Sequence, residues 1–463
     1  MPRAGTLPAV LTGVFITVLD FFIVNVAIPA TQRDLHAGSA AIEWVVAGYA
    51  LAYGSGLILG GRLGDIHGRR RMFMLGMGLF TLASIACGLA PGAAALVAAR
   101  VVQGAAAALL SPQVLAIVRT AYTGPAQLKA INAYALTMGL AAVFGQLIGG
   151  VLIHADLFGL GWRACFLINV PIGIAVLAVA RKVIPESRAP EAVRLDLGGA
   201  ALVTSALVAT LLPLIEGREQ GWPLWTWMSF AGAAALFVAY GRRRRYDAPL
   251  IDPALFRQRA FTTGLFTALA FTMGMAAYFL IFALYAQQGR GLDALEAGLF
   301  FVPIGAGYLG ASLLAPRLVA RIGRQTIALG GLTRALGLGV LSVLVAQDVA
   351  IGWLVPVLVL DGVGMGLALA PIMTTVLSRV APQHAGAAAG ALTTAQQVGG
   401  ALGVGVVGIV YYGSLADGVT TAFRHGLVYL VLVALALAGL VQLLPRTAAR
   451  TKAAPVAREG AHA

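Results

Sequence analysis

Apolar residues along the chain fall into fourteen long blocks that are separated by short polar hinges. Each block is about 18 to 26 residues long, which is the length that an α-helix needs to cross the hydrocarbon core of a bilayer. We therefore predict an all-α integral membrane protein with fourteen transmembrane helices. The predicted spans are 7–29, 44–61, 72–90, 93–118, 130–153, 164–183, 197–215, 223–240, 261–286, 296–316, 326–346, 351–377, 386–412 and 426–444.

The polar segments between these blocks are too short to form a separate soluble domain. The longest of them surrounds Pro185–Arg194, and residues 446–463 are predicted to form a short disordered tail. The first apolar run, Leu7–Ile28, has no small-residue cleavage site behind it. We therefore expect this run to remain as a membrane span and not to be removed as a signal peptide.

Composition points to the same class. Of the 463 residues, 59% are hydrophobic and 11% are charged, and the mean hydropathy is +0.88. Soluble domains are about half apolar and a quarter charged, so this chain cannot cover its apolar residues with a polar surface. The two cysteines, Cys87 and Cys165, form neither a metal-binding spacing nor a disulfide framework. The six histidines are scattered, so no metal site is expected.

The formal net charge of +14 is distributed unevenly between alternate loops. Loops on one side, together with both termini, hold 25 Lys and Arg against 7 Asp and Glu, whereas loops on the other side hold 5 Arg and 9 acids. The positive-inside rule places the basic side, and with it both termini, in the cytoplasm. The basic residues are expected to face lipid head groups, and nucleic acid is not an expected partner.

Segments of the first half of the chain reappear about 255 residues later. Chance matching between Gly-rich and Ala-rich helices is the alternative explanation for any single pair, but three pairs in one order favour an internal repeat. The matched segments are Arg62–Arg70 with Arg317–Gln325, Gly104–Pro112 with Gly362–Pro371, and Gly145–Gly150 with Gly399–Val404.

The repeat divides the predicted helices into six, two and six. We predict a six-helix bundle at 1–194, a central two-helix insertion at 195–245, a second six-helix bundle at 246–445 and the cytoplasmic tail at 446–463. Two similar bundles are typical of transporters that rock around a site near the middle of the membrane.

The hinge between the second and third spans has a specific spacing of glycines and charges. Its glycines allow a tight turn, and an ion pair or a helix N-terminus is expected to hold its acid. Such a contact at the cytoplasmic face can connect the two bundles and break as the protein opens inward. The candidate gating residues are Gly61, Arg62, Gly64, Asp65, Gly68, Arg69 and Arg70.

Four charged residues lie well inside predicted spans: Asp20, Arg100, Arg334 and Asp361. A charge at the bilayer centre costs at least about 3 kcal/mol, so such residues are rare and usually functional. Each half of the chain therefore holds one acid and one arginine near mid-depth.

Our hypothesis for the first half is that Asp20 carries a transported proton. Removal from water strengthens the hold of a carboxylate on a proton, and a nearby arginine weakens it. Movement of Arg100 toward or away from Asp20 would therefore switch proton affinity. The alternative is a static ion pair that only neutralises two buried charges. For Arg334 and Asp361, a structural pair and a second coupling site are equally open.

Several segments resemble motifs of the major facilitator superfamily, in particular of its fourteen-span drug/proton antiporters. The hinge at Gly61–Arg71 resembles the superfamily signature, and the resemblance is strongest over residues 19–173. The other matching segments are Leu19–Pro29 in the first span, Arg100–Gly104 in the fourth, Gly139 with Gly145, Gln146, Leu147, Ile148, Gly149 and Gly150 in the fifth, and Trp162–Arg163 with Asn169–Gly173 at the sixth. Two positions depart from the pattern: Phe22 replaces a frequent Thr, and Gln146 replaces the Pro of the antiporter motif.

The resemblance implies the major facilitator fold and proton-coupled efflux of drugs or antibiotics by alternating access, with no enzymatic activity and no cofactor. The implied substrate is lipophilic and often cationic, and Asp20 and Asp361 are the membrane-embedded acids expected to attract a cation. The implied protein is a monomer in the bacterial inner membrane. Candidate cavity residues are Asn25, Tyr49, Tyr53, Gln103, Tyr278 and Tyr285, although packing explains each tyrosine equally well.

Two other functions remain open at this point. A symporter that imports a metabolite would share the fold, and the Gln146 departure leaves room for it. A transport-inactive membrane sensor would also share the fold, although it would have no reason to retain Asp20, Asp65 and Arg100.

Overall fold

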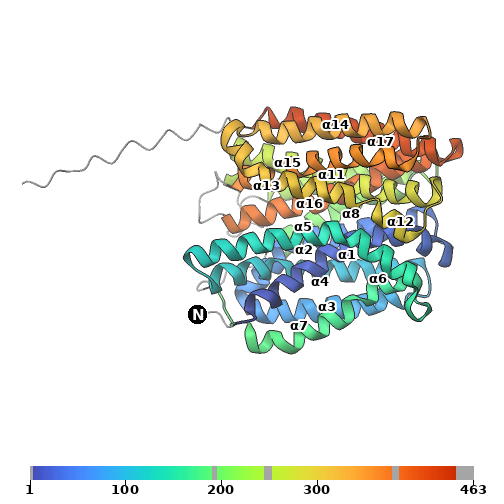
Figure 1. Cartoon of the computed structure of the whole chain (residues 1–463). Coiled ribbons are helices and arrows are strands. Elements are labelled where there is room, and N and C mark those ends of the chain that lie inside the picture. The colour runs from blue at the N-terminus through green and yellow to red at the C-terminus, as the bar shows by residue number, and fades with distance from the viewer. Residues whose placement is uncertain (1–3, 190–195, 244–252, 378–384, 445–463) are drawn as a thin grey trace, which may run out of the picture.

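The computed structural model describes residues 4–189, 196–243, 253–377 and 385–444, and every regular element in these ranges is a helix. Most of the helices run roughly side by side as one bundle (Figure 1). Within the described ranges, thirteen helices are long and apolar enough to cross a membrane. A fourteenth span consists of two parts, Gly124–Ala142 and Phe144–Ala155, that are inclined by 42°. The fourteen predicted spans are thereby confirmed.

The first half of the chain contributes six spans that pack on one another. Helix α1 packs against α5, α2 against α4, and α3 against both α4 and α7. The elements are α1 (Thr6–Asp34), α2 (Ser39–His67), α3 (Arg69–Gly88), α4 (Ala93–Ala121), α5 (Gly124–Ala155), the 3-10 turns η1 (Leu157–Gly159) and η2 (Gly161–Arg163), α6 (Ala164–Leu167) and α7 (Asn169–Val183).

The second half repeats this arrangement, with α11 against α16, α13 against α15, and α14 against α15 and α17. Helices α12 and α13 together form one span, and α11 continues into a π-helical turn, η3. The elements are α10 (Pro253–Arg257), α11 (Arg259–Leu284), η3 (Tyr285–Gly289), α12 (Ala294–Leu299), α13 (Val302–Ile322), α14 (Gln325–Ala346), η4 (Ile351–Leu354), α15 (Val355–Leu377), α16 (Ala385–Gly413), η6 (Leu415–Asp417) and α17 (Val419–Val441).

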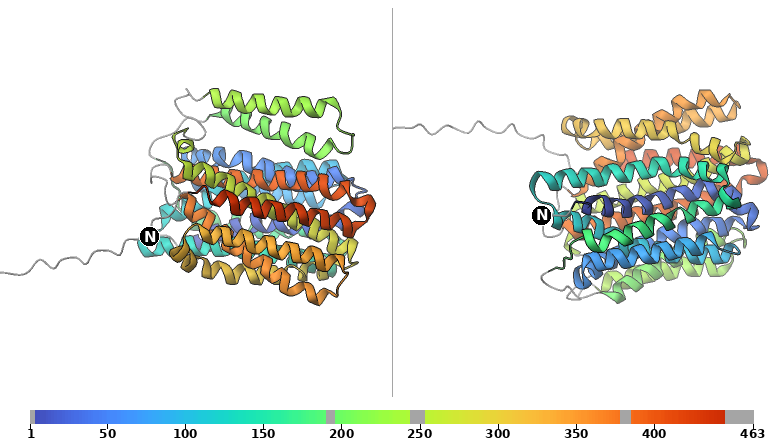
Figure 2. Two further views of the ribbon diagram at one scale, coloured as in Figure 1. Left: turned by 90° about the horizontal axis from the view of Figure 1, so that it is seen from above. Right: turned by 60° about the horizontal axis from the view of Figure 1, so that its bottom comes forward.

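Two helices between the halves, α8 (Leu197–Glu216) and α9 (Leu224–Arg242), form a hairpin at the edge of the bundle (Figure 2). Helix α8 contacts α2 of the first half and α16 of the second. Helix α9 packs mainly on α8 and buries only Thr226 and Ala233. Most of the surface of α9 is therefore available to lipid.

The repeated segments occupy equivalent places in the two halves. Arg62–Arg70 joins α2 to α3, and Arg317–Gln325 joins α13 to α14. Gly145–Gly150 lies in α5, and Gly399–Val404 lies in α16, which is the corresponding helix of the second half. The similarity in sequence thus corresponds to a similarity in position.

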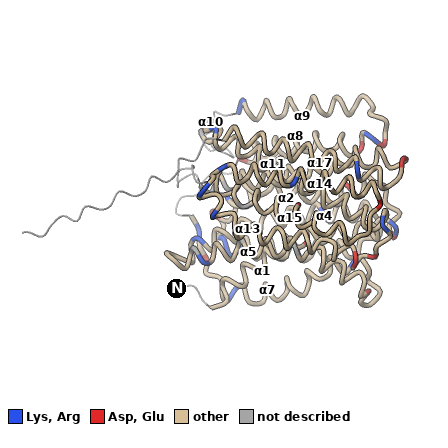
Figure 3. The backbone as a smooth tube through the Cα atoms, turned by 45° about the horizontal axis from the view of Figure 1, so that its top comes forward, with Lys and Arg blue, Asp and Glu red and all other residues tan. Residues whose placement is uncertain are grey.

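Basic residues gather at the end of the bundle that holds the N-terminus, and acids are more frequent at the opposite end (Figure 3). We call these the basic end and the far end. The far end contains the hinges at 35–38, 217–223 and 347–350. This separation is the one expected of a membrane protein with positively charged loops on a single side.

Glycine permits unusually close contact between neighbouring helices. A β-carbon placed on Gly104 of α4 would lie 2.3 Å from the Tyr49 carbonyl oxygen of α2. In the second half, a β-carbon on Gly362 of α15 would lie 2.0 Å from the Ile304 carbonyl oxygen of α13. Close backbone approach of this kind is how helices pack in lipid, where the hydrophobic effect does not drive them together.

The two halves meet at the far end. His154 Nδ1 of α5 lies 3.1 Å from Asp293 Oδ2, which precedes α12. Gln287 Nε2 of η3 donates a hydrogen bond to the Val26 carbonyl of α1 at 2.9 Å. A β-carbon on Gly150 would lie 2.5 Å from the Ala294 carbonyl oxygen. The far end is therefore closed in this structure.

Candidate functional site

Asp20 of α1 and Arg100 of α4 form an ion pair inside the first half, and neither side chain is exposed to any measurable extent. Gln103 lies one helical turn after Arg100, so both project from the same face of α4. Gln103 Nε2 donates to Asp20 Oδ1 at 2.9 Å, and Arg100 Nη1 donates to Gln103 Oε1 at 2.7 Å. Asp20 and Arg100, which the sequence places near mid-depth in the membrane, are thus in direct contact.

Helix α7 reaches the same carboxylate, and α3 contacts the residues that bind it. Asn169 Nδ2, at the start of α7, donates to Asp20 Oδ1 at 2.8 Å. Ser84 Oγ of α3 accepts hydrogen bonds from Gln103 Nε2 at 2.9 Å and from Asn169 Nδ2 at 3.3 Å. We call Asp20, Ser84, Arg100, Gln103 and Asn169 the Asp20 network. It joins α1, α4 and α7 at one buried carboxylate, and α3 enters through Ser84.

Arg100 also has partners that do not depend on Asp20. Its Nε donates to the Val45 carbonyl at 3.0 Å, and its guanidinium lies 4.2 Å from the centre of the Tyr49 ring. Tyr49 is fixed in turn by a 3.1 Å hydrogen bond from its hydroxyl to the Thr17 carbonyl. An arginine over an aromatic face is favourable, most of all where water is excluded. Arg100 therefore remains anchored to α2 and α4 if Asp20 becomes neutral.

The second half holds a separate buried pair. Arg334 Nε of α14 donates to Asp361 Oδ1 of α15 at 2.9 Å, and the two side chains are 4% and 1% exposed. Among the described residues, Arg334 Nη2 and Asp361 Oδ2 have no hydrogen-bond partner. This pair has fewer supporting contacts than the Asp20 network.

The hinge between α2 and α3 binds the segment that follows α7. Asp65 Oδ1 accepts a hydrogen bond from Arg69 Nη2 at 2.7 Å, within the hinge itself. The backbone N–H of Arg70 donates to Glu186 Oε1 at 3.0 Å, and that of Arg69 donates to the Ser187 carbonyl at 2.9 Å. These contacts all lie within the first half. A connection from the hinge to the second half stays a prediction.

The structure explains why two positions of this hinge, Gly64 and Gly68, are occupied by glycine. Gly68 adopts a φ of 107°, a backbone conformation that residues other than glycine rarely adopt. A β-carbon on Gly64 would lie 1.9 Å from Gln113 Oε1 of α4. Gly61 and Arg62 lie in the last turns of α2, just before these positions.

Helix α5 bends although Gln146 replaces the proline of the antiporter pattern. The bend of 42° falls between Ala142 and Phe144, so position 143 lies four residues after Gly139 and two before Gly145. Glycine-containing segments are a recognised site of helix kinks, and close packing holds this one. A β-carbon on Gly145 would lie 2.9 Å from Phe22 Cβ.

The polar and small residues around this bend are enclosed by both halves. Gln146 is fully buried, and its side-chain amide has no hydrogen-bond partner among the described residues. A β-carbon on Gly149 would lie 2.6 Å from Val26 Cγ1 of α1, while Gly150 faces Ala294 of the second half. Helix α5 thus contacts α1 and α12 along this segment.

The remaining candidates for cavity lining are largely occupied by packing. Tyr53 stacks edge-on against Tyr49 at 5.9 Å between ring centres. Tyr285 stacks in parallel on Phe423 at 4.2 Å. Tyr278 lies with its ring centre 5.8 Å from the Arg334 guanidinium, and Asn25 donates to the carbonyl of its own helix three residues earlier. The packing alternative explains Tyr49, Tyr53 and Tyr285 well.

A third buried acid, Glu43, was missed from the sequence. The predicted span 44–61 began one residue after it, but α2 begins at Ser39 and Glu43 is only 1% exposed. Glu43 is therefore a buried acid in addition to Asp20 and Asp361. An acid directly before Trp44 at the start of an apolar block was the available signal. The guanidinium of Arg218 lies 3.4 Å from Glu43.

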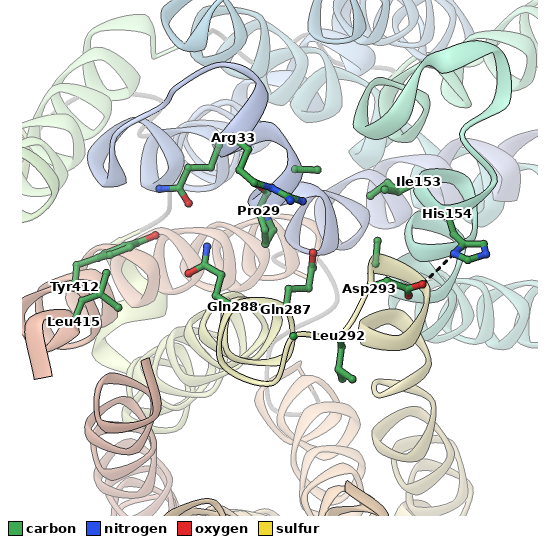
Figure 4. A pocket seen from close by; sticks show the side chains of 14 residues that line it. Pro29, Arg33, Ile153, His154, Gln287, Gln288, Leu292, Asp293, Tyr412 and Leu415 are labelled. Atoms are coloured by element: carbon green, nitrogen blue, oxygen red, sulfur yellow. Dashed lines mark hydrogen bonds and ion pairs between the residues drawn. The ribbon is translucent and has the colours of Figure 1, made fainter. Parts of the chain in front are cut away.

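A vestibule of about 770 Å³ opens at the far end between the two halves (Figure 4). Polar groups from both halves line it, including Arg33, His154, Gln287 and Asp293. The hydrogen bond between His154 and Asp293 crosses one side of this vestibule. The backbone N–H of Glu296 and the His154 ring hold the pKa of Asp293 below its ordinary value.

Comparison with known proteins adds close relatives. Residues 10–404 match the family model described as the Major Facilitator Superfamily. A probable actinorhodin transporter of Streptomyces coelicolor is 40% identical, with 92% of this chain and 75% of the relative covered. The puromycin resistance protein pur8 of Streptomyces alboniger is 36% identical over 89% of this chain and 82% of its own. The multidrug resistance protein Stp of Mycobacterium tuberculosis is 34% identical over 88% and 75%.

Solved structures support the fold independently. A POT family transporter in complex with a thioalcohol conjugated peptide superimposes with a TM-score of 0.70 at 16% identity, covering 96% of this chain and 97% of the other. The xylose transporter XylE from E. coli gives a TM-score of 0.63 at 13% identity, covering 92% and 97%. Together with the family match and the relatives above 30% identity, these similarities establish that the chain belongs to the major facilitator superfamily.

Proposed function

We propose that this chain exports a small-molecule antibiotic or drug across the bacterial inner membrane in exchange for protons. The names of the relatives, which include a transporter of actinorhodin and resistance proteins for puromycin and multiple drugs, support the substrate class. The fully buried Asp20 network is the observation that carries the proposal of proton coupling. The substrate is lipophilic and often cationic, the carrier acts as a monomer without a cofactor, and it catalyses no covalent chemistry.

The basic end faces the cytoplasm in this proposal, together with both termini, as the positive-inside rule requires. The contacts of His154 with Asp293 and of Gln287 with Val26 then close the outer side. In this proposal the structure is therefore a state of the carrier whose outer side is shut.

In the proposed mechanism, a proton and Arg100 compete for the Asp20 carboxylate. A carboxylate accepts charge-assisted hydrogen bonds that are about twice as strong as neutral ones, so a proton on Asp20 weakens the bonds from Arg100, Gln103 and Asn169 together. Arg100 keeps its contacts with the Val45 carbonyl and the Tyr49 ring. Helix α1 is then released from α4 and α7 while α4 stays attached to α2.

Loss of these bonds would allow α1 to shift relative to its neighbours and the halves to change their inclination. Each proton that crosses a potential of 100 mV supplies about 2.3 kcal/mol, which is enough for roughly a fifty-fold concentration gradient of a neutral substrate. The free energy released by inward proton flow is therefore sufficient to drive export.

Transport direction and proton dependence can be tested together with ethidium as the probe. Inverted membrane vesicles that contain the chain should accumulate ethidium when acidified inside, and a protonophore should abolish the accumulation. Vesicles with Asp348→Asn, an acid whose side chain is 88% exposed at the far end, serve as the matched control and should behave like wild type. Accumulation only when the medium outside the vesicles is the acidic side would indicate a symporter, and no accumulation under either gradient would favour a sensor.

A further inference from the structure

The hinge between α8 and α9 crosses the boundary between the two halves at the far end. Arg218 in this hinge donates from Nη2 to Ser39 Oγ at 2.7 Å and lies 3.4 Å from Glu43 Oε1, both on α2. Its Nη1 donates to the Gly408 carbonyl of α16 at 3.2 Å, and its guanidinium lies 4.8 Å from the ring centre of Tyr412. One guanidinium therefore binds α2 of the first half and α16 of the second.

Two acids also attach this region to α2: Glu219 in the hinge and Glu216, the last residue of α8. Glu219 Oε1 accepts hydrogen bonds from Ser39 Oγ and from the backbone N–H of Ala40, the latter at 3.1 Å. Glu216 Oε1 accepts a hydrogen bond from Trp44 Nε1 at 3.0 Å. The hinge is thus fixed to the start of α2, and Arg218 is its polar contact with α16.

Glu43 lies directly in the interface that Arg218 covers. A β-carbon on Gly408 would lie 2.3 Å from the Glu43 carboxylate, so the carboxylate rests against the backbone of α16. Oε2 of Glu43 has no hydrogen-bond partner among the described residues. The charged groups facing Glu43 are the cation of Arg218 and the carboxylates of Glu216 and Glu219.

This arrangement is stable only while the cation is present. A buried charge that loses its partner is costly, and here two other carboxylates lie nearby. Separation of α2 from α16 would instead admit water to the carboxylate and solvate it. Loss of Arg218 should therefore favour the state in which the far end is open.

We propose that Arg218, Glu43, Ser39 and Glu219 form an outer clasp that holds α2 against α16 and sets how readily the carrier opens to the outside. Arg218 acts as a positioning residue of the transport cycle and does not contact substrate in this role. The central hairpin is then a part of the gate and more than a spacer between the halves. The location of the clasp on the outer side of the membrane rests on the proposed function, whereas its contacts do not.

Distances between spin labels test the clasp without any substrate. Cysteines at Leu157 of the first half and Asp417 of the second, both exposed at the far end, carry the labels in a chain whose Cys87 and Cys165 are replaced by Ala. In lipid nanodiscs, Arg218→Gln should raise the ratio of open to closed populations on the order of tenfold, the effect of losing a charged hydrogen bond.

Arg290→Gln is the matched control for this measurement. Arg290 pairs with Asp348, and its side chain is 15% exposed, as is that of Arg218. Both Arg290 and Asp348 belong to the second half, so their pair does not cross the boundary. The control should leave the distance distribution of wild type unchanged.

Glu43→Gln provides the second variant, because it removes the charge that needs Arg218. Arg218→Gln in the Glu43→Gln background should change the distances less than it does alone, and this double variant should reach the membrane even if Arg218→Gln alone does not. Unchanged distances in both single variants would overturn the clasp. A shift in Arg218→Gln in a chain whose wild type exports nothing would sustain the clasp and refute the proposed function.

Discussion

Gly104→Ala is a small substitution at a point that supports the Asp20 network. The added methyl group would lie 2.3 Å from the Tyr49 carbonyl oxygen and 3.1 Å from its carbonyl carbon. Backbone atoms cannot rotate away, so α2 and α4 must separate by about 1 Å to reach an ordinary contact distance. Such overpacking costs about 1–3 kcal/mol of folding free energy.

The same displacement should impair coupling. Gln103 precedes Gly104, and Arg100 lies one turn earlier on α4, where its Nε binds the Val45 carbonyl of α2 at 3.0 Å. A separation of about 1 Å would lengthen this hydrogen bond beyond useful range. We expect Gly104→Ala to have a lower Tm in detergent and a slower proton-driven export than wild type.

Gly78→Ala is the control for this experiment. Gly78 lies in α3, and a β-carbon there would meet nothing within 4 Å. Alanine is about 1 kcal/mol more favourable than glycine inside a helix, so this variant should have a Tm equal to or above that of wild type. Scanning fluorimetry of the three proteins provides the comparison. Equal Tm values for Gly104→Ala and wild type would refute the inferred packing of α2 on α4.

Two further predictions concern the second half. Arg334→Gln should lower the free energy of unfolding by about 3–5 kcal/mol because it leaves Asp361 buried without its cation. The double variant with Asp361→Asn should lose less stability. Additive losses of stability in scanning fluorimetry would contradict direct pairing. Asp293 caps α12, and its lowered pKa means that its contribution to stability is present above its unfolded pKa, near 3.8, and is lost as pH falls through the folded value. The Tm difference between wild type and Asp293→Ala should thus not decrease from about pH 8 to 5, where the His154 partner can only gain charge, and should shrink below pH 4. A difference that shrinks between pH 7 and 5 would contradict this assignment.

The membrane spans and the buried Asp20–Arg100 pair were predictable from sequence because both follow from the cost of polar groups in hydrocarbon. A charge near the middle of an apolar block needs a partner, and few candidates were available. The neutral members of the network gave a weaker signal. Ser84 and Asn169 are ordinary polar residues in apolar helices, and only the tertiary packing of α3 and α7 brings them to Asp20.

Glu43 shows where reasoning from hydropathy fails. A window that averages apolar character ends at the first charge, so Glu43 was assigned to a loop, while the helix continues to Ser39 because Glu219 and Arg218 provide polar partners there. Those partners lie more than 170 residues away along the chain. The bend in α5 was also not foreseen once Gln146 had replaced proline, since it depends on packing around Gly145.

The most direct test of proton coupling through Asp20 is the proton flux that accompanies substrate movement. In proteoliposomes that contain a pH-sensitive dye, wild type should release protons in response to an ethidium gradient, and Asp20→Asn should bind ethidium but move no protons. Asp361→Asn, in the second half, shows whether the effect is specific to the Asp20 network. Proton flux at the wild-type rate in Asp20→Asn would contradict the proposed mechanism.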